Sequence, residues 1–261
     1  MPSLFGATPN PGWKFTKSRE LGTIAPSAIL HSFSFKKGTG VEVEKAEINA
    51  LAFQEKDFLL TVLDHPLENK SLREATQEAC CMAGINGGYF QPDGAPLGLL
   101  MHAGKMIHPQ ERAAILSGFF VRTPHGMTLL RVGEIIPSDA IEILQAGPFL
   151  LDRSRPIHGL ESTKKAYRSF VATNGNGLWI IGIISPVTLA EASHILGILH
   201  TKYISGMATR PLTRALNLDG GSSSSLLATT KPTPFSFREY VCVRNFLGLQ
   251  NKEQTEYQVL N

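Results

Sequence analysis

The sequence predicts one domain of the α/β class, in the α+β sense: a mixed, largely antiparallel sheet with helices flanking it. Short apolar or alternating runs recur along the chain, which is typical of strands. The 24 glycines and 16 prolines are spread between these runs, as turns between short strands require. Only two segments show helical spacing behind a capping residue. With 261 residues and 43% hydrophobic content, the chain is long enough to bury one full core.

The strands are expected from residue 29 onward. Alternation over 31–35 and 41–44, followed by the apolar run 58–63, predicts three successive strands in a meander. Asn174-Gly175-Asn176-Gly177 predicts the clearest hairpin, because these residues tolerate positive φ between two apolar runs. The other expected strands are 115–121, 127–132, 141–151, 169–173, 178–184, 214–218 and 240–247.

Two helices are expected. Ser71-Leu72-Arg73-Glu74 is a capping box, in which the serine hydroxyl accepts from the N3 amide while Glu74 reaches back to the cap amide. This helix continues to Gly84, where a left-handed C-terminal cap is expected. A second helix begins behind Ser185, with Pro186 at its first position. The apolar positions at helical spacing are Leu72, Ala75, Ala79 and Met82 in the first helix and Leu189, Ala192, Leu196 and Leu199 in the second.

The charge balance does not indicate a nucleic-acid surface. The formal net charge is +3, and nucleic-acid surfaces need basic residues clustered on one face. The densest basic stretch spans residues 153–168 and is interrupted by Pro156 and Gly159, so it fits a local anion site better. We therefore expect no nucleic-acid partner.

The cysteines and the N-terminal residues leave the compartment open. Cys80, Cys81 and Cys242 show no CxxC spacing, and an odd number permits one bridge at most. No run of eighteen apolar residues is present, so no transmembrane segment is expected. Residues 1–25 lack the apolar core of a secretory signal and are expected to form an extended arm.

The most informative segment is Leu216-Asn217-Leu218-Asp219-Gly220-Gly221-Ser222-Ser223-Ser224-Ser225. Glycines adopt turn angles barred to other residues and let a backbone approach a ligand, so successive amides can point into one concavity that holds an anion. Asp219 is expected at the lip of that concavity. The plainer alternative is a strand that ends in a serine-rich turn.

A second segment, Asn86-Gly87-Gly88-Tyr89-Phe90, repeats this pattern of a polar side chain and paired glycines after a capped element. Taken alone, an Asn-Gly pair is a common hairpin signal. Two such turns in one domain predict a shared site, with both glycine motifs at one end of the sheet.

The order of the motifs resembles that of the phosphodiester glycosidase family. The matching residues are Asn86-Gly87-Gly88-Tyr89-Phe90, Pro96, Gly98, Gln145-Ala146-Gly147-Pro148-Phe149-Leu150, Arg168 and Ala215-Leu216-Asn217-Leu218-Asp219-Gly220-Gly221-Ser222-Ser223. The resemblance covers residues 29–247, and its last motif is the most specific. It implies a family domain over residues 26–250, with the arm over 1–25 before it and a tail over 251–261 after it.

The resemblance implies hydrolysis of the bond between an anomeric carbon and a phosphodiester, which releases a sugar and a phosphomonoester. Since a phosphate departs more readily than an alkoxide, the site needs less help from a general acid. It needs a cation and amides for the phosphate and a carboxylate for the oxocarbenium-like centre or the attacking water. A glycan or cell-envelope substrate, with a periplasmic or secreted location, follows from the same resemblance to relatives associated with exopolysaccharide biosynthesis.

The resemblance assigns the site residues one by one. Asp219 is the leading carboxylate, as nucleophile, base or orienting group, and Arg168 is the phosphate clamp, because a guanidinium binds two phosphate oxygens at once. Asn86 completes the predicted catalytic set. The predicted substrate- and phosphate-binding residues are Gly87, Gly88, Gly98, Gly147, Gly220, Gly221, Ser222 and Ser223.

Two other functions stay open, a non-catalytic module that binds an anionic glycan and a metal-dependent phosphodiesterase. No HExxH or HxH ligand set is present, so a metal is not predicted, although a divalent cation remains compatible with the motifs. Ser222 lacks the GxSxG context of a serine hydrolase. The next candidates for the site are His102, His108 and His158, together with Glu111 and Glu161 as second carboxylates.

Overall fold

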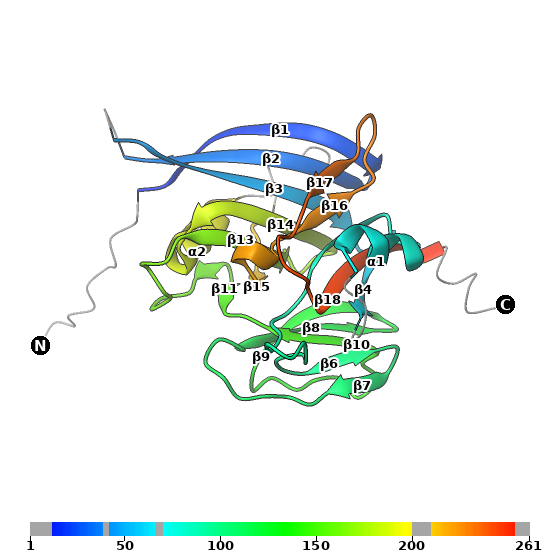
Figure 1. Cartoon of the computed structure of the whole chain (residues 1–261). Coiled ribbons are helices and arrows are strands. Elements are labelled where there is room, and N and C mark those ends of the chain that lie inside the picture. Colours follow the sequence, from blue (N-terminus) through cyan, green and yellow to red (C-terminus); the bar gives the residue numbers. More distant parts are fainter. Residues whose placement is uncertain (1–11, 39–41, 66–69, 200–209, 254–261) are drawn as a thin grey trace, which may run out of the picture.

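The computed structural model describes residues 12–38, 42–65, 70–199 and 210–253, which form three antiparallel sheets and two α-helices (Figure 1). Every pairing between the named strands is antiparallel. The predicted sheet-rich domain with two flanking helices is therefore confirmed, and the single predicted sheet is divided into three.

The largest sheet has eight strands. Their spatial order is β1 (Lys14–Ala25), β2 (Ala28–Lys37), β3 (Glu44–Gln54), β14 (Leu178–Val187), β13 (Ala166–Thr173), β15 (Arg214–Asn217), β11 (Phe149–Asp152) and β12 (Arg155–Pro156). The β13–β14 hairpin turns at Asn174-Gly175-Asn176-Gly177, where Gly175 and Gly177 have φ of 67° and 82°, as the sequence predicts. The hairpin places Arg168 at the start of β13, opposite Ile184 of β14.

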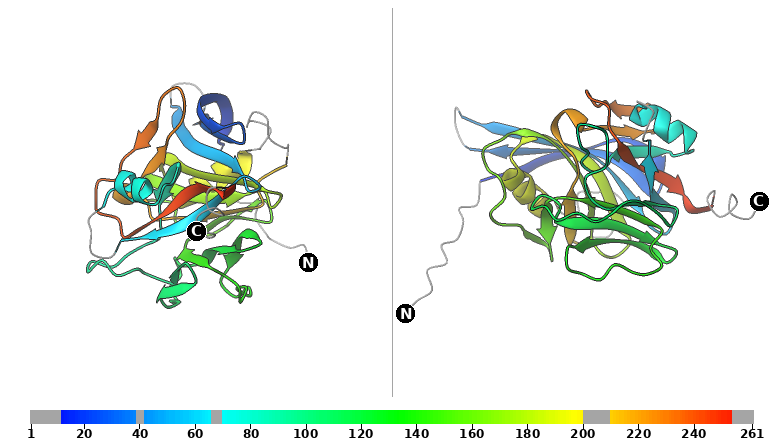
Figure 2. Two further views of the ribbon diagram at one scale, coloured as in Figure 1. Left: turned by 90° about the vertical axis from the view of Figure 1, so that its right-hand side faces the viewer. Right: turned by 60° about the horizontal axis from the view of Figure 1, so that its bottom comes forward.

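Each of the other two sheets has five strands. The first is ordered β17 (Phe235–Phe237), β16 (Leu226–Ala228), β5 (Ala83–Asn86), β18 (Asn245–Asn251) and β4 (Phe58–Asp64). The second is ordered β7 (Lys105–His108), β6 (Leu100–His102), β10 (Glu142–Ala146), β8 (Gly118–Thr123) and β9 (Gly126–Arg131). Figure 2 shows this second sheet, in green, on the opposite side of the molecule from the blue strands β1–β3.

The main core lies where the three sheets meet. Trp179 of β14, Leu247 of β18 and Phe120 of β8 are all buried in one apolar cluster. The Phe120 and Trp179 rings meet edge to face, with their centroids 6.0 Å apart. One continuous core therefore fixes the relative positions of the strand ends that carry the glycine motifs.

Glu142 of β10 links the β7–β6–β10–β8–β9 sheet to β4 of the other five-stranded sheet. Its buried carboxylate accepts from the Thr61 hydroxyl at 3.1 Å and the Val62 amide at 3.0 Å, and it pairs with Arg122 Nη2 at 2.9 Å. His102 Nδ1 lies 3.1 Å from the same carboxylate, which raises the pKa of the imidazole. His102, a sequence candidate for the site, is thus part of this structural cluster.

Helix α1 (Leu72–Glu78) begins with the predicted capping box: the Ser71 hydroxyl accepts from the Glu74 amide, and Glu74 accepts from the Ser71 amide. The predicted C-terminal cap at Gly84 is wrong, because the helix ends at Glu78 with Ala79 as its C-cap. The residue with positive φ that follows is Cys80. Gly84 lies inside β5, where a Cβ would come within 2.7 Å of Thr76 Cγ2. It is the close packing of α1 on β5 that excludes a side chain at this position.

Helix α2 (Leu189–Ile198) is also confirmed, but its predicted cap is displaced. The N-cap is Thr188, which forms a capping box with Glu191, while Ser185 and Pro186 still belong to β14. The helix packs on β11 and β12, and its Ile195 is buried in a second apolar cluster that also contains Phe33 and Phe35.

The ends of the domain differ from the sequence prediction. Residues 14–25 of the expected arm form β1 and pair along their length with β2, so this part belongs to the largest sheet. Residues 1–11 of that arm and 254–261 of the expected tail lie outside the described residues, and Asn251 ends β18. The strand predicted at 41–44 is also displaced, since β3 begins at Glu44.

Two general expectations can be compared with the described residues. Cys80, Cys81 and Cys242 are free thiols in the structure. Among the helices of the described ranges, none is long and apolar enough to cross a membrane.

Candidate active site

The two glycine motifs meet at the junction of two sheets. Asn86 ends β5, and Asp219 follows β15 by two residues. Asn86 Nδ2 donates to the Asp219 carbonyl at 2.7 Å, and the Asp219 amide donates to the Gly87 carbonyl at 3.0 Å. The two motifs are therefore adjacent, as predicted, although they come from different sheets rather than from one sheet end.

Asn86 joins these halves with its whole amide group. Besides the bond to Asp219, its Oδ1 accepts from the Ser169 hydroxyl at 2.6 Å and from the Ser225 amide at 3.0 Å. The side chain is fully buried. The sequence predicts Asn86 as a member of the catalytic set; in the structure its amide joins the end of β5 to β13 and to the residues that follow β15 and precede β16.

A second buried side-chain amide, that of Asn217, bonds to the motif around Gly147 and so joins it to the two glycine motifs. Asn217 Nδ2 donates to the Tyr89 hydroxyl and to the Gly147 carbonyl, each at 3.0 Å. The Tyr89 hydroxyl donates to the same Gly147 carbonyl at 2.6 Å. Gly147 thus contributes through its carbonyl oxygen, an acceptor that protein groups already use, rather than through an open anion site.

Asn245 supports the first glycine pair, and the sequence analysis missed it. Its Oδ1 accepts from the Gly88 amide at 2.8 Å, and its carbonyl accepts from the Gly87 amide at 2.8 Å. A Cβ on Gly87 would collide with this Asn245 side chain. Both amides predicted to hold phosphate are therefore bonded to protein, and no motif around Arg244-Asn245-Phe246 signals this role.

Gly221 differs from the other predicted glycines. A Cβ on Gly98 would lie 2.8 Å from Gln145 Oε1, and one on Gly220 would lie 2.7 Å from the Tyr167 carbonyl. At Gly221 the same Cβ would meet no described atom within 4 Å, and φ is +62°. A ligand can approach the backbone at Gly221, whereas Gly98 and Gly220 are required by packing within the protein.

Asp219 carries the carboxylate of this turn. Its Oδ1 accepts from the Gly220 amide at 2.8 Å, and the Ser223 hydroxyl also bonds to it. Burial nevertheless raises the pKa of Asp219 above its usual range, because desolvation outweighs these two hydrogen bonds. Within the described ranges, the amides of Gly221 and Ser222 have no hydrogen-bond acceptor. A carboxylate with a raised pKa and two available amides thus lie within four residues of chain.

Arg168 is held beside this turn by backbone carbonyls. Its Nε donates to the Val187 carbonyl at 3.0 Å and its Nη2 to the Lys164 carbonyl at 2.6 Å. Glu161 lies 3.7 Å from Nη2. The Nε–Nη2 edge of the predicted phosphate clamp is therefore occupied by protein carbonyls, which leaves Nη1 as the nitrogen without a partner in the described part of the chain.

Tyr89 is the neighbour that Asp219 and Arg168 share. Burial, together with the negative charge of Asp219, raises the pKa of the Tyr89 phenol, and the positive charge of Arg168 opposes this shift. Arg168 does not contribute to the pKa of Asp219. No ion pair joins Arg168 to Asp219 among the described residues, and the charges of both act on the buried Tyr89 phenol.

A sequence profile of the phosphodiester glycosidase family matches residues 79–250, about two thirds of the chain. The chain belongs to the phosphodiester glycosidase family. All the predicted site residues lie inside the matched region. No match is found among curated proteins.

Two solved structures share the fold of this protein. One is the catalytic domain of zebrafish N-acetylglucosamine-1-phosphodiester alpha-N-acetylglucosaminidase, auto-inhibited by its pro-peptide; the TM-score is 0.63 at 15% identity, over 90% of this chain and 88% of that chain. The other is a hypothetical protein from Synechocystis, with a TM-score of 0.58 at 14% identity, over 91% and 68% of the two chains. Since the first alignment spans 90% of the chain, the shared fold extends beyond the 79–250 match.

Glu111 and Glu161, the two candidates for a second carboxylate, contact residues outside the two glycine motifs. Glu111 lies 3.7 Å from His108 Nε2, and its backbone is bonded on both sides to Gln145. Glu161 accepts from the Thr163 and Lys164 amides and faces Arg168. Among the described residues, no three His, Cys, Asp or Glu side chains gather as a metal-binding group.

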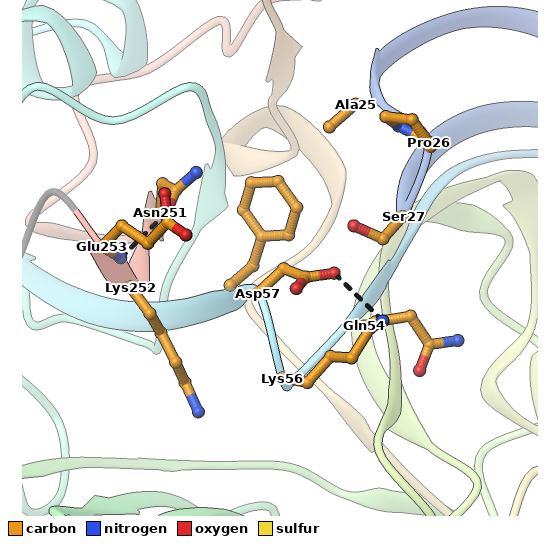
Figure 3. Close-up of a pocket in the computed structure, with 10 residues that line it drawn as sticks. Ala25, Pro26, Ser27, Gln54, Lys56, Asp57, Asn251, Lys252 and Glu253 are labelled. Atoms are coloured by element: carbon orange, nitrogen blue, oxygen red, sulfur yellow. Dashed lines mark hydrogen bonds and ion pairs between the residues drawn. The ribbon is translucent and has the colours of Figure 1, made fainter.

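A pocket of about 690 Å³ lies apart from the glycine motifs (Figure 3). It is formed by the β1–β2 and β3–β4 turns and the end of β18, and none of the predicted site residues lines it. Within the pocket, Lys56 Nζ lies 4.0 Å from Asp57 Oδ2, an ion pair that is marked by a dashed line in Figure 3. Lysines and acids are balanced in its lining, so it offers no excess positive charge for a phosphodiester.

Proposed function

We propose that this protein hydrolyses the glycosidic bond of a sugar-1-phosphodiester and releases a free sugar and a phosphomonoester. The observation that carries the proposal is that the Asp219 carboxylate and the Arg168 guanidinium form no ion pair with each other in the described residues, while the amides of Gly221 and Ser222, next to Asp219, lack a protein acceptor. A carboxylate and a cation that do not pair with each other suit a substrate with two different centres, an electron-poor anomeric carbon and an anionic phosphate.

The chemistry assigns one charge to each centre. Positive charge that develops on the anomeric carbon is stabilised by the Asp219 carboxylate, while Arg168 Nη1 and the amides of Gly221 and Ser222 face the phosphate. Water adds its oxygen to the anomeric carbon as the bond from that carbon to the phosphate oxygen breaks, and one proton of the water is lost. If Asp219 is the base, the anomeric configuration inverts; if it is the nucleophile, the configuration is retained.

Hydrolysis in oxygen-18 water tests this function with a panel of sugar-1-phosphodiesters. We expect the label in the released sugar, because water attacks carbon. Label in the phosphate product would instead identify a phosphodiesterase that attacks phosphorus. Binding of panel members without any product would identify a glycan-binding module, since a fold and a pocket do not guarantee chemistry.

Replacing Arg168 with alanine is expected to weaken substrate binding and lower turnover together, with a loss of about tenfold or more in kcat/KM. A guanidinium that holds the phosphate in the ground state and the transition state contributes to both steps. Inorganic phosphate should compete with substrate in the wild type and poorly in the variant. Steady-state kinetics with and without phosphate measure both effects.

Arg155→Ala is the matched control, since Arg155 belongs to the same basic stretch and is exposed. It should leave kinetics and phosphate competition unchanged. Because Arg168 also bonds to the Lys164 and Val187 carbonyls, thermal unfolding must show that the Arg168 variant is folded. A folded Arg168→Ala protein with normal phosphate competition would remove Arg168 from the phosphate site.

A further inference from the structure

The loop after β17 attaches an exposed tyrosine to the Asp219 turn. The Tyr240 amide donates to the Ser222 carbonyl at 2.7 Å, so the two backbones are in direct contact. The Tyr240 side chain is 83% exposed. Single exposed apolar side chains are common on protein surfaces, so exposure alone does not indicate a binding site. The residues around Tyr240 are therefore needed to argue for one.

The backbone on both sides of Tyr240 is anchored. Glu239 Oε1 accepts from the Leu72 amide at 2.8 Å, at the start of α1. Val243 is buried in the cluster beneath α1, and Arg244 Nε bonds to Asp64 at 2.7 Å. The Tyr240 ring is therefore exposed on a fixed support, which costs little conformational entropy when a ligand packs on it.

Another aromatic residue, Tyr167, contacts the same turn through its backbone. Tyr167 and Phe237 meet with their ring centroids 4.9 Å apart. The Tyr167 carbonyl packs so closely on Gly220 that a Cβ there would lie 2.7 Å away. The Gly220–Ser222 turn thus contacts Tyr167 through its first residue and Tyr240 through its last.

We propose that Tyr240, whose backbone is bonded to the Asp219 turn, is the surface on which the sugar ring of the substrate packs. A pyranose has an apolar C–H face and a polar rim, and a tyrosine ring has an apolar face and a polar tip. Tyrosine is suited to such sites because one end is apolar and the other remains hydrated. This inference rests on the proposed function and extends it by naming the substrate as a glycan recognised through an apolar ring face.

The test measures binding without hydrolysis, in the Asp219→Asn background. The probes are the methyl phosphodiesters of glucose-1-phosphate and N-acetylglucosamine-1-phosphate, with dimethyl phosphate as the matched ligand that has no sugar ring. Tyr240→Ala should weaken binding of at least one sugar probe about three- to tenfold, as measured by NMR titration. Dimethyl phosphate should bind unchanged, and Tyr240→Phe and Tyr240→Trp should retain sugar binding within about twofold.

Ile135→Ala is the control variant, because Ile135 is 90% exposed and belongs to no part of the site. The proposal is overturned if Tyr240→Ala binds the sugars normally, if Ile135→Ala weakens them equally, or if dimethyl phosphate is weakened to the same extent. Absence of sugar binding in the parent protein overturns it too. If Tyr240-dependent binding is present and the protein with Asp219 intact hydrolyses nothing, the sugar platform stands and the hydrolase function fails.

Discussion

Replacing Asp219 with asparagine is expected to lower turnover by about a hundredfold or more while substrate binding is retained, the scale for losing a positioned acid or base. The carboxylate acts mainly on the transition state, in which the anomeric carbon gains positive charge. In the wild type, Asp219 Oδ1 accepts from the Gly220 amide at 2.8 Å. Asparagine keeps an Oδ1 acceptor for the same amide. The change therefore removes the charge and preserves the turn.

The same variant is expected to be more stable at neutral pH. Burial raises the folded-state pKa of Asp219 above the unfolded value, so the ionised carboxylate destabilises the folded state. This penalty is complete above the raised pKa and disappears as pH falls below the unfolded pKa. The gain in Tm, about 2–4 °C for each ~1 kcal/mol, should therefore be seen at pH 7 and shrink towards acidic pH.

Steady-state kinetics and thermal unfolding at two pH values check this pair of effects. Asp139→Asn provides the control, since Asp139 carries the same substitution on an exposed side chain. It should change neither quantity. Near-normal turnover in a folded Asp219→Asn protein would contradict the assignment, and Glu161 beside Arg168 would be the next carboxylate to replace.

Replacing Asn86 with alanine is expected to cost about 3 kcal/mol or more of the free energy of unfolding. The change leaves three buried groups without a partner: the Ser169 hydroxyl, the Ser225 amide and the Asp219 carbonyl. Each such group costs about 1–3 kcal/mol when it is buried and unsatisfied. Activity should fall as well, because Asp219 loses the bond that positions its backbone.

Urea denaturation gives the free energy of unfolding, and two further variants grade the effect. Ser169→Ala removes one of the three bonds and should cost about 1 kcal/mol. Asn176→Ala, on an exposed asparagine of the β13–β14 turn, should stay within about 0.5 kcal/mol of the wild type. Equal stabilities for the Asn86 and Asn176 variants would show that the buried amide does not hold the sheet junction.

Local signals in the sequence predicted the structure well where a few neighbouring residues decide it. The Ser71–Glu74 capping box and the Asn174–Gly177 turn are of this kind, since each works within four residues. The cap of α2 was misplaced because Ser185-Pro186 also suits a cap, and only the pairing of Val187 with Ala166 shows that β14 continues past it.

Distant contacts explain what the sequence could not provide. Gly87 and Gly220 each look like turn residues, yet each is excluded from bearing a side chain by a partner far along the chain, Asn245 and Tyr167 respectively. Asn245 supports the first motif from 157 residues away and carries no local signature. The motifs therefore predicted which strand ends lie together, while the distinction between glycines with open space and glycines packed against protein required the structure.

The bond from Asn86 to Asp219 spans 133 residues, and the one from Gly88 to Asn245 spans 157. During synthesis the first motif must therefore wait until most of the remaining chain has emerged from the ribosome before its amides find their acceptors. A nascent chain that has not yet reached Asn245 lacks the support of Gly87 and Gly88, so the amides of the first motif are held in place only after Asn245 has emerged. No shorter nascent chain is therefore expected to carry the complete candidate site.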